Sequence, residues 1–285
     1  MKIAVIGKRG QLASEFFDIK AKDNKWTFLS KNDLDITKID QVRLFFRSRD
    51  YDIIINCSGF TNVEQAEKKR EQAFNLNEKA VNNLVLACKE FNCKLIHFST
   101  DYVFDGTTKQ PYRETDSTFP INTYGKSKEA GEKIIGNSDV KSVIIRSSWI
   151  YSSFGNNFVK KIIAIVREKN KLEIVNDQIG SPTYAKDVVK ACLLIINNTN
   201  YKWKNHGEIF HYSNEGECSW YEFAKEVVRL KNINVPLEPK KSKELFKAIK
   251  RPKYSVLDKS KIKSTFKIYI PDWEDSLKKI INNFK

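Results

Sequence analysis

The chain has 285 residues, of which 41% are hydrophobic and 30% are charged, and it contains only 11 glycines and 7 prolines. This length suits one large domain or two modest ones, and this composition excludes collagen-like and low-complexity chains and argues against wholesale disorder. Fifty Lys and Arg against 35 Asp and Glu give a net charge of +15. Because the lysines are scattered among acidic residues, we expect a lysine-rich surface that suits an anionic ligand, and no nucleic-acid partner.

The sequence also points away from membranes and disulfides. It has no apolar run as long as a membrane-spanning helix, so we expect no membrane partner. Residues 1–7 are too short for a signal peptide and are typical of a buried strand, which favours a cytoplasmic protein. Five cysteines without a Cys-x-x-Cys pair favour free thiols over disulfides or a zinc site.

Short β-branched runs alternate with helical patterns through the first half of the chain. The strands are predicted at 3–6, 26–29, 53–55, 94–98 and 142–145. The helices are predicted from about residue 11, over 38–48, over 71–91 and from residue 124 onward. This alternation predicts right-handed βαβ crossovers, and therefore an α/β fold with a doubly wound, Rossmann-like parallel sheet.

The rhythm changes after about residue 150. Helical patterns cover 156–168, 186–196, 219–231 and 272–284, and Ser219 to Glu222 has the Ser-x-x-Glu form of a capping box. We expect residues 1–150 to form the dinucleotide-binding domain, with about 184–200 returning to it. Residues 151–285 would mainly form a smaller, interleaved α/β lobe that binds the substrate.

A glycine turn follows the first predicted strand. Residues 7–13 read Gly-Lys-Arg-Gly-Gln-Leu-Ala, a G-x-x-G-x-x-A pattern between a strand and a helix. Gly7 permits a tight turn, Gly10 lets the backbone approach a pyrophosphate, and Ala13 lets the helix pack close to the sheet. In the first βαβ unit, this pattern predicts dinucleotide binding.

The end of the second predicted strand bears on the choice of cofactor. A carboxylate there would hold a ribose 2′-hydroxyl and repel a 2′-phosphate. The chain has Ser30 and Lys31 instead, with Arg9 in the glycine turn. This combination favours NADPH, with NADH as an accepted alternative, although Lys31 also fits an ordinary solvated surface lysine.

Three polar residues form a candidate catalytic group. Tyr124 and Lys128 are four residues apart at the start of a predicted helix, which places both side chains on one face. Thr100 ends a predicted strand, where sites of open α/β sheets lie. A lysine ammonium can lower the pKa of a phenol, and the tyrosine can then pass a proton to a carbonyl oxygen. Together with the glycine turn, this is the arrangement of extended short-chain dehydrogenases/reductases.

Two longer motifs make the resemblance more specific. Ser-Thr-Asp-Tyr-Val-Phe at 99–104 is followed by Arg-Ser-Ser-Trp-Ile-Tyr at 146–151, and the chain thereby resembles the dTDP-4-dehydrorhamnose reductase family. The matching segments cover nearly the whole chain: 7–12, 34–37, 56–61, 99–106, 122–132, 146–151, 155–159, 177–183 and 251–255.

The resemblance implies roles for individual residues. Those on the cofactor would be Gly10, Gln11 and Leu12 at the pyrophosphate, Asp35 and Ile36 at the adenine, and Gly59, Phe60 and Thr61 beneath the dinucleotide. Those on the substrate would be Thr100 and Asp101 at the sugar, Trp149 as its apolar wall, and Arg251 at the nucleotide diphosphate.

The activity that the resemblance implies is NAD(P)H-dependent reduction of the C4 ketone of dTDP-4-dehydro-L-rhamnose. The product is dTDP-L-rhamnose, and this is the last step of a pathway that supplies cell-surface polysaccharide. Tyr124 would supply the proton, Lys128 would lower its pKa and hold the ribose, and Thr100 would hydrogen-bond the C4 oxygen. Two alternatives stay open: a related reductase giving the other C4 epimer, of the 6-deoxy-L-talose type, and a non-catalytic dinucleotide-binding regulatory subunit.

The chain also departs from the family pattern. Residues 56–61 read Asn-Cys-Ser-Gly-Phe-Thr where the family usually has Asn-Ala-Ala-Ala-Tyr/His-Thr. Glu15 is present, but Lys186 stands where some relatives carry a second acidic residue for magnesium at a dimer contact. This argues against a metal-bridged dimer and leaves a homodimer open. His97 is expected to be packed rather than catalytic, and Arg146 is left without a role.

Overall fold

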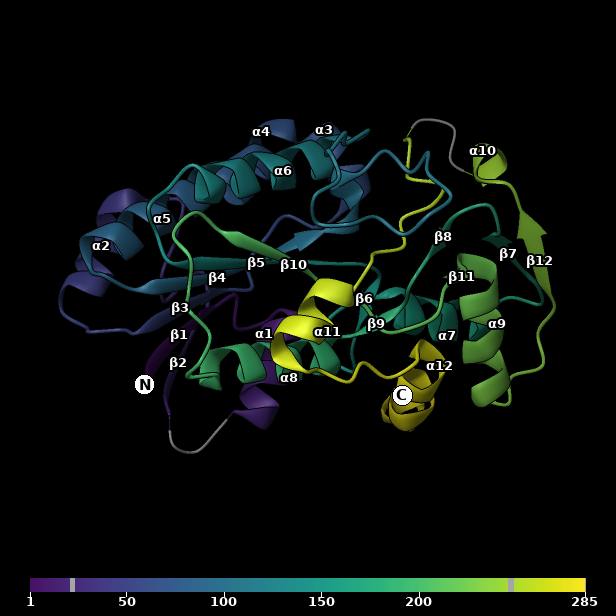
Figure 1. Cartoon of the computed structure of the whole chain (residues 1–285). Coiled ribbons are helices and arrows are strands. Elements are labelled where there is room, and N and C mark those ends of the chain that lie inside the picture. The colour runs from purple at the N-terminus through teal and green to yellow at the C-terminus, as the bar shows by residue number, and fades with distance from the viewer. Residues whose placement is uncertain (21–23, 246–248, 285) are drawn as a thin grey trace.

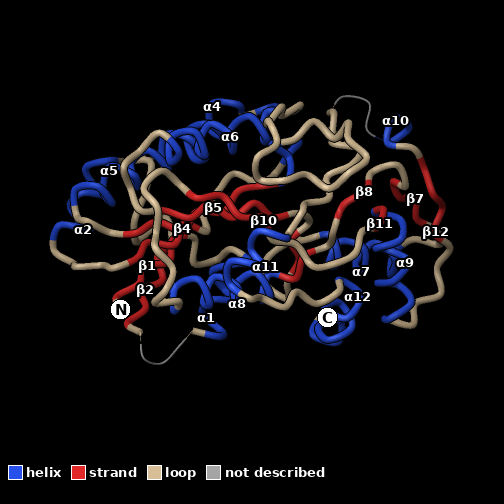
Figure 2. The backbone as a smooth tube through the Cα atoms, in the orientation of Figure 1, coloured by secondary structure: helices blue, strands red, loops and turns tan. Residues whose placement is uncertain are grey.

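The computed structural model describes residues 1–20, 24–245 and 249–284. Its centre is a six-stranded parallel sheet in the order β10-β5-β4-β3-β1-β2 (Figures 1 and 2). The strands are β1 (Lys2–Ile6), β2 (Lys25–Leu29), β3 (Ile53–Asn56), β4 (Lys94–Thr100), β5 (Ser142–Ser147) and β10 (Glu208–His211). The strands predicted in the first half are therefore confirmed, and β10 is a further strand contributed by the second half.

Helices cover both faces of this sheet, as a doubly wound fold requires. Successive side chains of a strand point to opposite faces, and β1 shows this directly. Ile3 and Val5 pack in one apolar cluster with α1 (Gln11–Ile19) and α8 (Ala185–Asn197). Ala4 and Ile6 pack in the other, with α2 (Ile39–Arg47) and α5 (Ala80–Glu90). Figure 1 shows α1 and α8 below the sheet, and α2, α5 and α6 (Thr123–Gly136) above it.

The helix predicted over 71–91 is not a single regular α-helix. It consists of α4 (Arg70–Phe74), a π-helical turn (Asn75–Lys79) and α5. The π turn carries buried Asn77, whose Oδ1 accepts from the Phe60 N–H at 2.8 Å and whose Nδ2 donates to the Phe60 carbonyl at 3.0 Å. Such bulges often occur at functional sites, and this one holds the loop that follows β3. Helix α3 (Val63–Lys68) comes after that loop.

The second half forms a lobe around its own apolar cluster, which includes Tyr151, Phe223 and Trp273. Its helices are α7 (Phe158–Glu168), α9 (Trp220–Leu230), α10 (Ser242–Leu245) and α12 (Trp273–Ile280), whereas α11 (Ser260–Phe266) packs in the apolar cluster of the main sheet. Its strands are short: β6 (Ile150–Tyr151), β7 (Leu172–Val175), β8 (Ile179–Gly180), β9 (Thr183–Tyr184), β11 (Cys218–Ser219) and β12 (Leu237–Lys240). The 3-10 turns are Asp101–Val103 and Ile281–Asn283. The predicted capping box of α9 is confirmed, because the Ser219 and Glu222 side chains bond each other's backbone N–H.

Candidate active site

A hollow of about 530 Å³ lies where β3, β4 and β5 end, and it extends to the lobe. Its walls include most of the predicted cofactor and sugar residues. They are Arg9, Gly10, Gln11, Leu12, Gly59, Thr61, Thr100, Asp101, Tyr124 and Trp149. Residues brought in from the second half include Gly155, Asn156 and Trp220. The carboxyl edge of a parallel sheet is where ligands of this fold class bind.

A second hollow of about 510 Å³ takes five more of the predicted dinucleotide residues. Gly7, Lys31, Asp35, Ile36 and Phe60 line it. Gly7 has φ +96°, and a Cβ there would lie 3.0 Å from the backbone of Cys57 and Ser58, so the turn needs glycine. Ser30 lines neither hollow, and its hydroxyl donates to Asp33 Oδ2 at 2.6 Å.

The candidate catalytic residues meet because β4 ends beside the start of α6. Asn122 caps this helix by accepting from the Gly125 N–H at 2.8 Å. A Cβ at Gly125 would collide with the Tyr102 carbonyl, so glycine lets the helix start lie against the turn after β4. Tyr124 then hydrogen-bonds Thr100, whose hydroxyl also donates to Asp101 Oδ1 at 3.0 Å.

Burial governs the electrostatics of this group. Burial raises the pKa of Tyr124 to about 12, against the opposing effect of the Thr100 hydrogen bond. Burial likewise raises the pKa of Asp101 to about 6. It lowers the pKa of Lys128 to about 8. The Lys128 amine does not bond the phenol here: it donates to the Phe98 carbonyl at 2.6 Å and lies 3.0 Å from His97 Nε2. At neutral pH the phenol therefore keeps its proton, as a general acid must.

An aromatic pair forms the lobe side of the hollow. Trp149 stacks on Trp220, with ring centroids 3.5 Å apart and planes 9° apart. Trp149 has φ +46°, which is uncommon for a bulky residue and typical of strained functional sites. A Cβ on Gly180 would lie 2.6 Å from Trp149 Cε2, so glycine makes room for the indole. Sequence reasoning missed Trp220 and Gly180, because only the fold brings them to Trp149.

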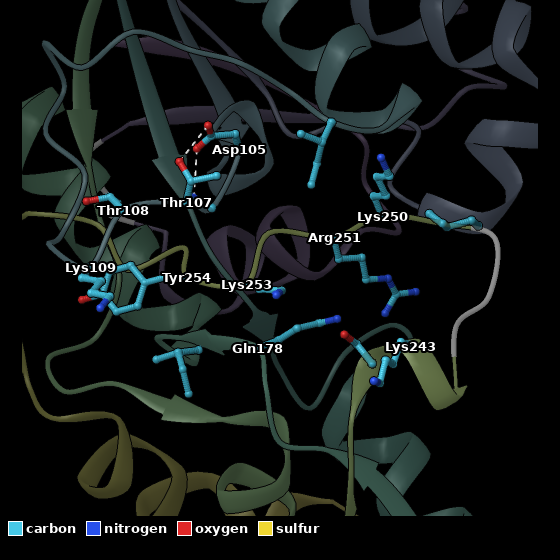
Figure 3. Close-up of a pocket in the computed structure, with 15 residues that line it drawn as sticks. Asp105, Thr107, Thr108, Lys109, Gln178, Lys243, Lys250, Arg251, Lys253 and Tyr254 are labelled. Carbon is cyan, nitrogen blue, oxygen red and sulfur yellow. Dashed lines mark hydrogen bonds between the residues drawn. The ribbon is translucent and has the colours of Figure 1, made fainter.

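Arg251 lies apart from the sugar residues, in a hollow of about 1130 Å³ that Lys243, Lys250 and Lys253 also line. Figure 3 shows Arg251 and Gln178 projecting into this space from different segments. The Arg251 guanidinium forms an ion pair with Glu64 of α3. It also acts electrostatically on Tyr102, which lines the catalytic hollow. The concentration of positive charge suits an anionic group such as a diphosphate.

Glu15 and Lys186, which bear on the magnesium question, have protein partners. Ser152 donates to Glu15 Oε1 at 2.6 Å, and the Lys186 amine lies 2.6 Å from Asp18 Oδ2. Within residues 1–20, 24–245 and 249–284, no group of three or more His, Cys, Asp or Glu is arranged to hold a metal ion. Over the same residues, no helix is both long and apolar enough to span a membrane.

His97 and Arg146 also have defined surroundings. His97 is fully buried between Asn56 and Lys128, as expected for a packed residue. Arg146 forms a buried ion pair with Glu132 of α6 at 2.7 Å, which gives the unassigned arginine a structural role.

Comparison with known proteins extends over the whole chain. The family model described as "RmlD substrate binding domain" matches residues 1–285. The dTDP-4-dehydrorhamnose reductase of Aggregatibacter actinomycetemcomitans is 35% identical, over 98% of each chain. A crystal structure of a dTDP-4-dehydrorhamnose reductase from Clostridium acetobutylicum superposes with a TM-score of 0.92 at 36% identity, covering 99% of each chain. The dTDP-4-dehydrorhamnose reductase of Bacillus anthracis, solved in complex with NADP, gives 0.91 at 35% identity, covering 99% of this chain and 98% of that one. The chain belongs to the dTDP-4-dehydrorhamnose reductase family.

Proposed function

We propose that the chain reduces the C4 ketone of dTDP-4-dehydro-L-rhamnose to dTDP-L-rhamnose with NADPH. One observation carries the proposal: a single hollow joins the glycine turn, the Thr100–Tyr124 pair and the Trp149 wall. A dinucleotide, a proton donor and a sugar-binding surface would thus meet at one place. The names of the family's relatives support this substrate, and the NADP complex of the Bacillus anthracis relative supports the cofactor.

The dinucleotide fits the residues present. Gly7 has a positive φ, and a Cβ on Gly10 would lie only 3.2 Å from the Gly7 carbonyl oxygen. The tight turn therefore carries no side chain at either of its two glycines. The first turn of α1 follows at once, so its free N–H groups and partial positive charge suit a pyrophosphate. When bound, the reduced nicotinamide supplies the hydride that reaches C4.

The chain's own residues would handle the proton. Tyr124 would donate its phenolic proton to the C4 oxygen as negative charge develops there, and Thr100 would hydrogen-bond the same oxygen. Lys128 would hold the nicotinamide ribose. Its ammonium, once beside the phenol, would ease loss of the phenolic proton. Trp149 would cover the apolar side of the deoxysugar, with Asp101 at its hydroxyl groups.

The hollow around Arg251 would receive the nucleotide diphosphate of the substrate. Arg251, Lys250 and Lys253 together supply three cationic side chains, which match the negative charges of a diphosphate. Arg251 also acts electrostatically on Tyr102, which lines the catalytic hollow.

For the cofactor, we propose a preference for NADPH with some use of NADH. Arg9 and Lys31 lie on the two hollows that would hold the dinucleotide. Lys31 lies 3.9 Å from Asp35 and is 81% exposed, so a 2′-phosphate could draw it away at little cost.

We also propose how the chain is divided and where it acts. Residues 1–150, with 184–200, would bind the dinucleotide, and residues 151–285 would mainly bind the nucleotide sugar; β10 is a further segment that returns to the main sheet. All five cysteines are free, which agrees with action in the reducing cytoplasm. A homodimer without a bridging metal is proposed as the assembly, and sedimentation equilibrium would test it.

Tyr124→Phe tests the catalytic assignment. The substitution removes the proton donor, and general acid catalysis is worth about 10²–10⁴-fold, so kcat should fall by at least that range. NADP⁺ affinity should stay close to that of the wild type. Tyr269→Phe is the matched control, because Tyr269 is 83% exposed. If Tyr124→Phe keeps most of its turnover, the assignment is wrong; if the wild type binds NADP⁺ but shows no turnover, the regulatory-subunit alternative gains support.

A further inference from the structure

Lys128 is at one end of a buried series of hydrogen bonds that runs through His97 to Asn56. Asn56 ends β3 and pairs in register with His97 of the neighbouring β4. Asn56 Nδ2 lies 3.1 Å from His97 Nδ1, and Lys128 Nζ lies 3.0 Å from His97 Nε2. All three side chains are at most 3% exposed. Because no bulk water reaches these groups, each donor must face an acceptor.

Ser58, which is not itself part of the Asn56–His97–Lys128 series of hydrogen bonds, fixes the orientation of the Asn56 amide. The backbone N–H of Ser58 donates to Asn56 Oδ1 at 3.1 Å, and the Ser58 hydroxyl donates to the same oxygen at 2.6 Å. A backbone N–H can only donate, so the oxygen must face Ser58 and the NH₂ group must face His97. An amide NH₂ is itself only a donor, so His97 Nδ1 must be the bare, accepting nitrogen.

This orientation decides which nitrogen of His97 carries the proton. Burial holds the pKa of His97 well below its usual value, so the ring is neutral and has one N–H. With Nδ1 bare, that N–H is on Nε2 and points at the Lys128 amine. An ammonium there would set two donors face to face. A neutral amine can accept from Nε2–H and still donate to the Phe98 carbonyl.

The charged groups around Lys128 do not reverse this conclusion. Glu132, one turn further along α6, favours the ammonium, but its carboxylate is committed to Arg146 of β5. At the head of the helix, Glu67 of α3 accepts from the backbone N–H and hydroxyl of Thr123. Asp101 follows β4, and its carboxylate is bonded by Thr100. Tyr124, on the same face of α6, is protonated at neutral pH. Burial of the lysine acts in the same direction as His97 and lowers its pKa to about 8.

We propose that Asn56 and His97 hold Lys128 as a neutral amine in the free enzyme at mildly alkaline pH, and that dinucleotide binding releases it as an ammonium with uptake of one proton. The ribose hydroxyl oxygens offer acceptors that His97 does not, so the charged form is favoured once they arrive. The proton comes from solvent, and no bond other than N–H forms. Asn56 and His97 are positioning residues in this scheme, and the scheme rests on the proposed function for its ligand.

The first test needs no ligand. The chain has three histidines, so imidazole ¹⁵N spectra of the free protein are simple to assign, with His97→Gln identifying the His97 signals. The Nε2–H tautomer is expected at pH 9, where the amine of Lys128 is largely neutral. An Nδ1–H tautomer, or a charged ring, would overturn the proposal whether or not the chain is a reductase.

The second test counts protons. NADP⁺ binding is measured calorimetrically at pH 9 in two buffers of different ionisation enthalpy. The wild type should take up about one proton per site, because Lys128 is then largely neutral before binding. Uptake should fall toward pH 7. Binding without proton uptake at pH 9 would contradict the proposal, whereas absence of NADP⁺ binding would refute the proposed function, and the tautomer would still be decided by the spectra.

Asn56→Asp distinguishes control of the Lys128 charge by Asn56 and His97 from an ordinary packing role of these residues. The carboxylate has nearly the shape of the amide but accepts from Nδ1–H, so the His97–Lys128 pair would already hold the extra proton. Proton uptake should then vanish while NADP⁺ still binds. Ser58→Ala is the control, because the backbone N–H still orients Asn56, and its uptake should match the wild type. If Asn56→Asp does not fold, His97→Gln removes the Nε2–H donor and leaves only burial acting on the amine, so uptake at pH 9 should fall below the wild-type value. Wild-type uptake in either variant would overturn the proposal.

Discussion

Gly180→Ala should displace the wall of the sugar site while leaving the dinucleotide site alone. The new Cβ would lie 2.6 Å from Trp149 Cε2 and 2.8 Å from Cζ2 and Nε1. Near-equal distances to three neighbouring ring atoms mean that it meets the face of the indole. The other face is covered by Trp220 at a centroid distance of 3.5 Å, so the ring has no free direction of retreat. Carbon atoms pack at about 3.5–4.0 Å, so Trp149 must move by about 1 Å.

The displacement of Trp149 should lower both the stability of the protein and its rate with the nucleotide sugar. Overpacking of this kind costs about 1–3 kcal/mol of stability. A displacement of about 1 Å at a positioning surface can cost about 10²-fold in rate, and we expect kcat/KM for the nucleotide sugar to fall toward that extent. NADP⁺ affinity should not change, because no dinucleotide residue moves. Thermal melting, steady-state kinetics with the sugar varied and NADP⁺ titration measure the three quantities.

Gly136→Ala is the matched control for this variant. A Cβ on Gly136 would meet nothing within 4 Å, so stability and kcat/KM should stay near those of the wild type. If Gly180→Ala has normal kcat/KM for the sugar, the indole does not form the wall of the substrate site. If it loses NADP⁺ affinity together with sugar affinity, the damage is general and the reasoning about the wall fails.

Three further predictions concern charge. Burial raises the pKa of Asp101 from 3.8 to about 6, so the native protein holds this proton more tightly than the unfolded chain does, and stability falls as pH rises through that interval. Asp101→Asn should therefore raise the free energy of unfolding at pH 7 by at most about 3 kcal/mol, which a higher melting temperature would report. The substitution should have little effect at pH 3. Arg146→Met leaves the buried Glu132 carboxylate uncompensated and should cost about 3–5 kcal/mol in urea denaturation, most of which Glu132→Leu in the same chain should restore. Ser30→Asp should lower the ratio of kcat/KM for NADPH to that for NADH, and an unchanged ratio would show that residue 30 does not face the ribose.

The sheet domain was predictable because its local signals agree with one another. Buried strands of a parallel sheet are continuous apolar runs, and each is followed by a helix with apolar periodicity. The lobe gave weaker signals: β6, β8, β9 and β11 have only two residues each, too few for any periodicity. Strand β10 has four residues and belongs to the main sheet only because it pairs with β5, far away in sequence.

The candidate site divides in the same way. The Tyr124–Lys128 spacing and the glycine turn are local patterns, so the sequence predicts them. The stack of Trp149 on Trp220 joins residues from two lobe segments, and the Asn56–His97 contact depends on the register of β3 against β4. No local sequence pattern predicts either contact, because tertiary packing alone creates it.

The most direct measurement of the proposed function is one reaction. The purified chain is incubated with NADPH and enzymatically prepared dTDP-4-dehydro-L-rhamnose. The nicotinamide absorbance is followed, and the C4 configuration of the product is then determined by NMR. The account predicts loss of one NADPH per sugar reduced and formation of dTDP-L-rhamnose. Oxidation of NADPH with the 6-deoxy-L-talose epimer as product would contradict the assigned substrate geometry, and absence of any NADPH oxidation would contradict the assignment of the chain as a reductase.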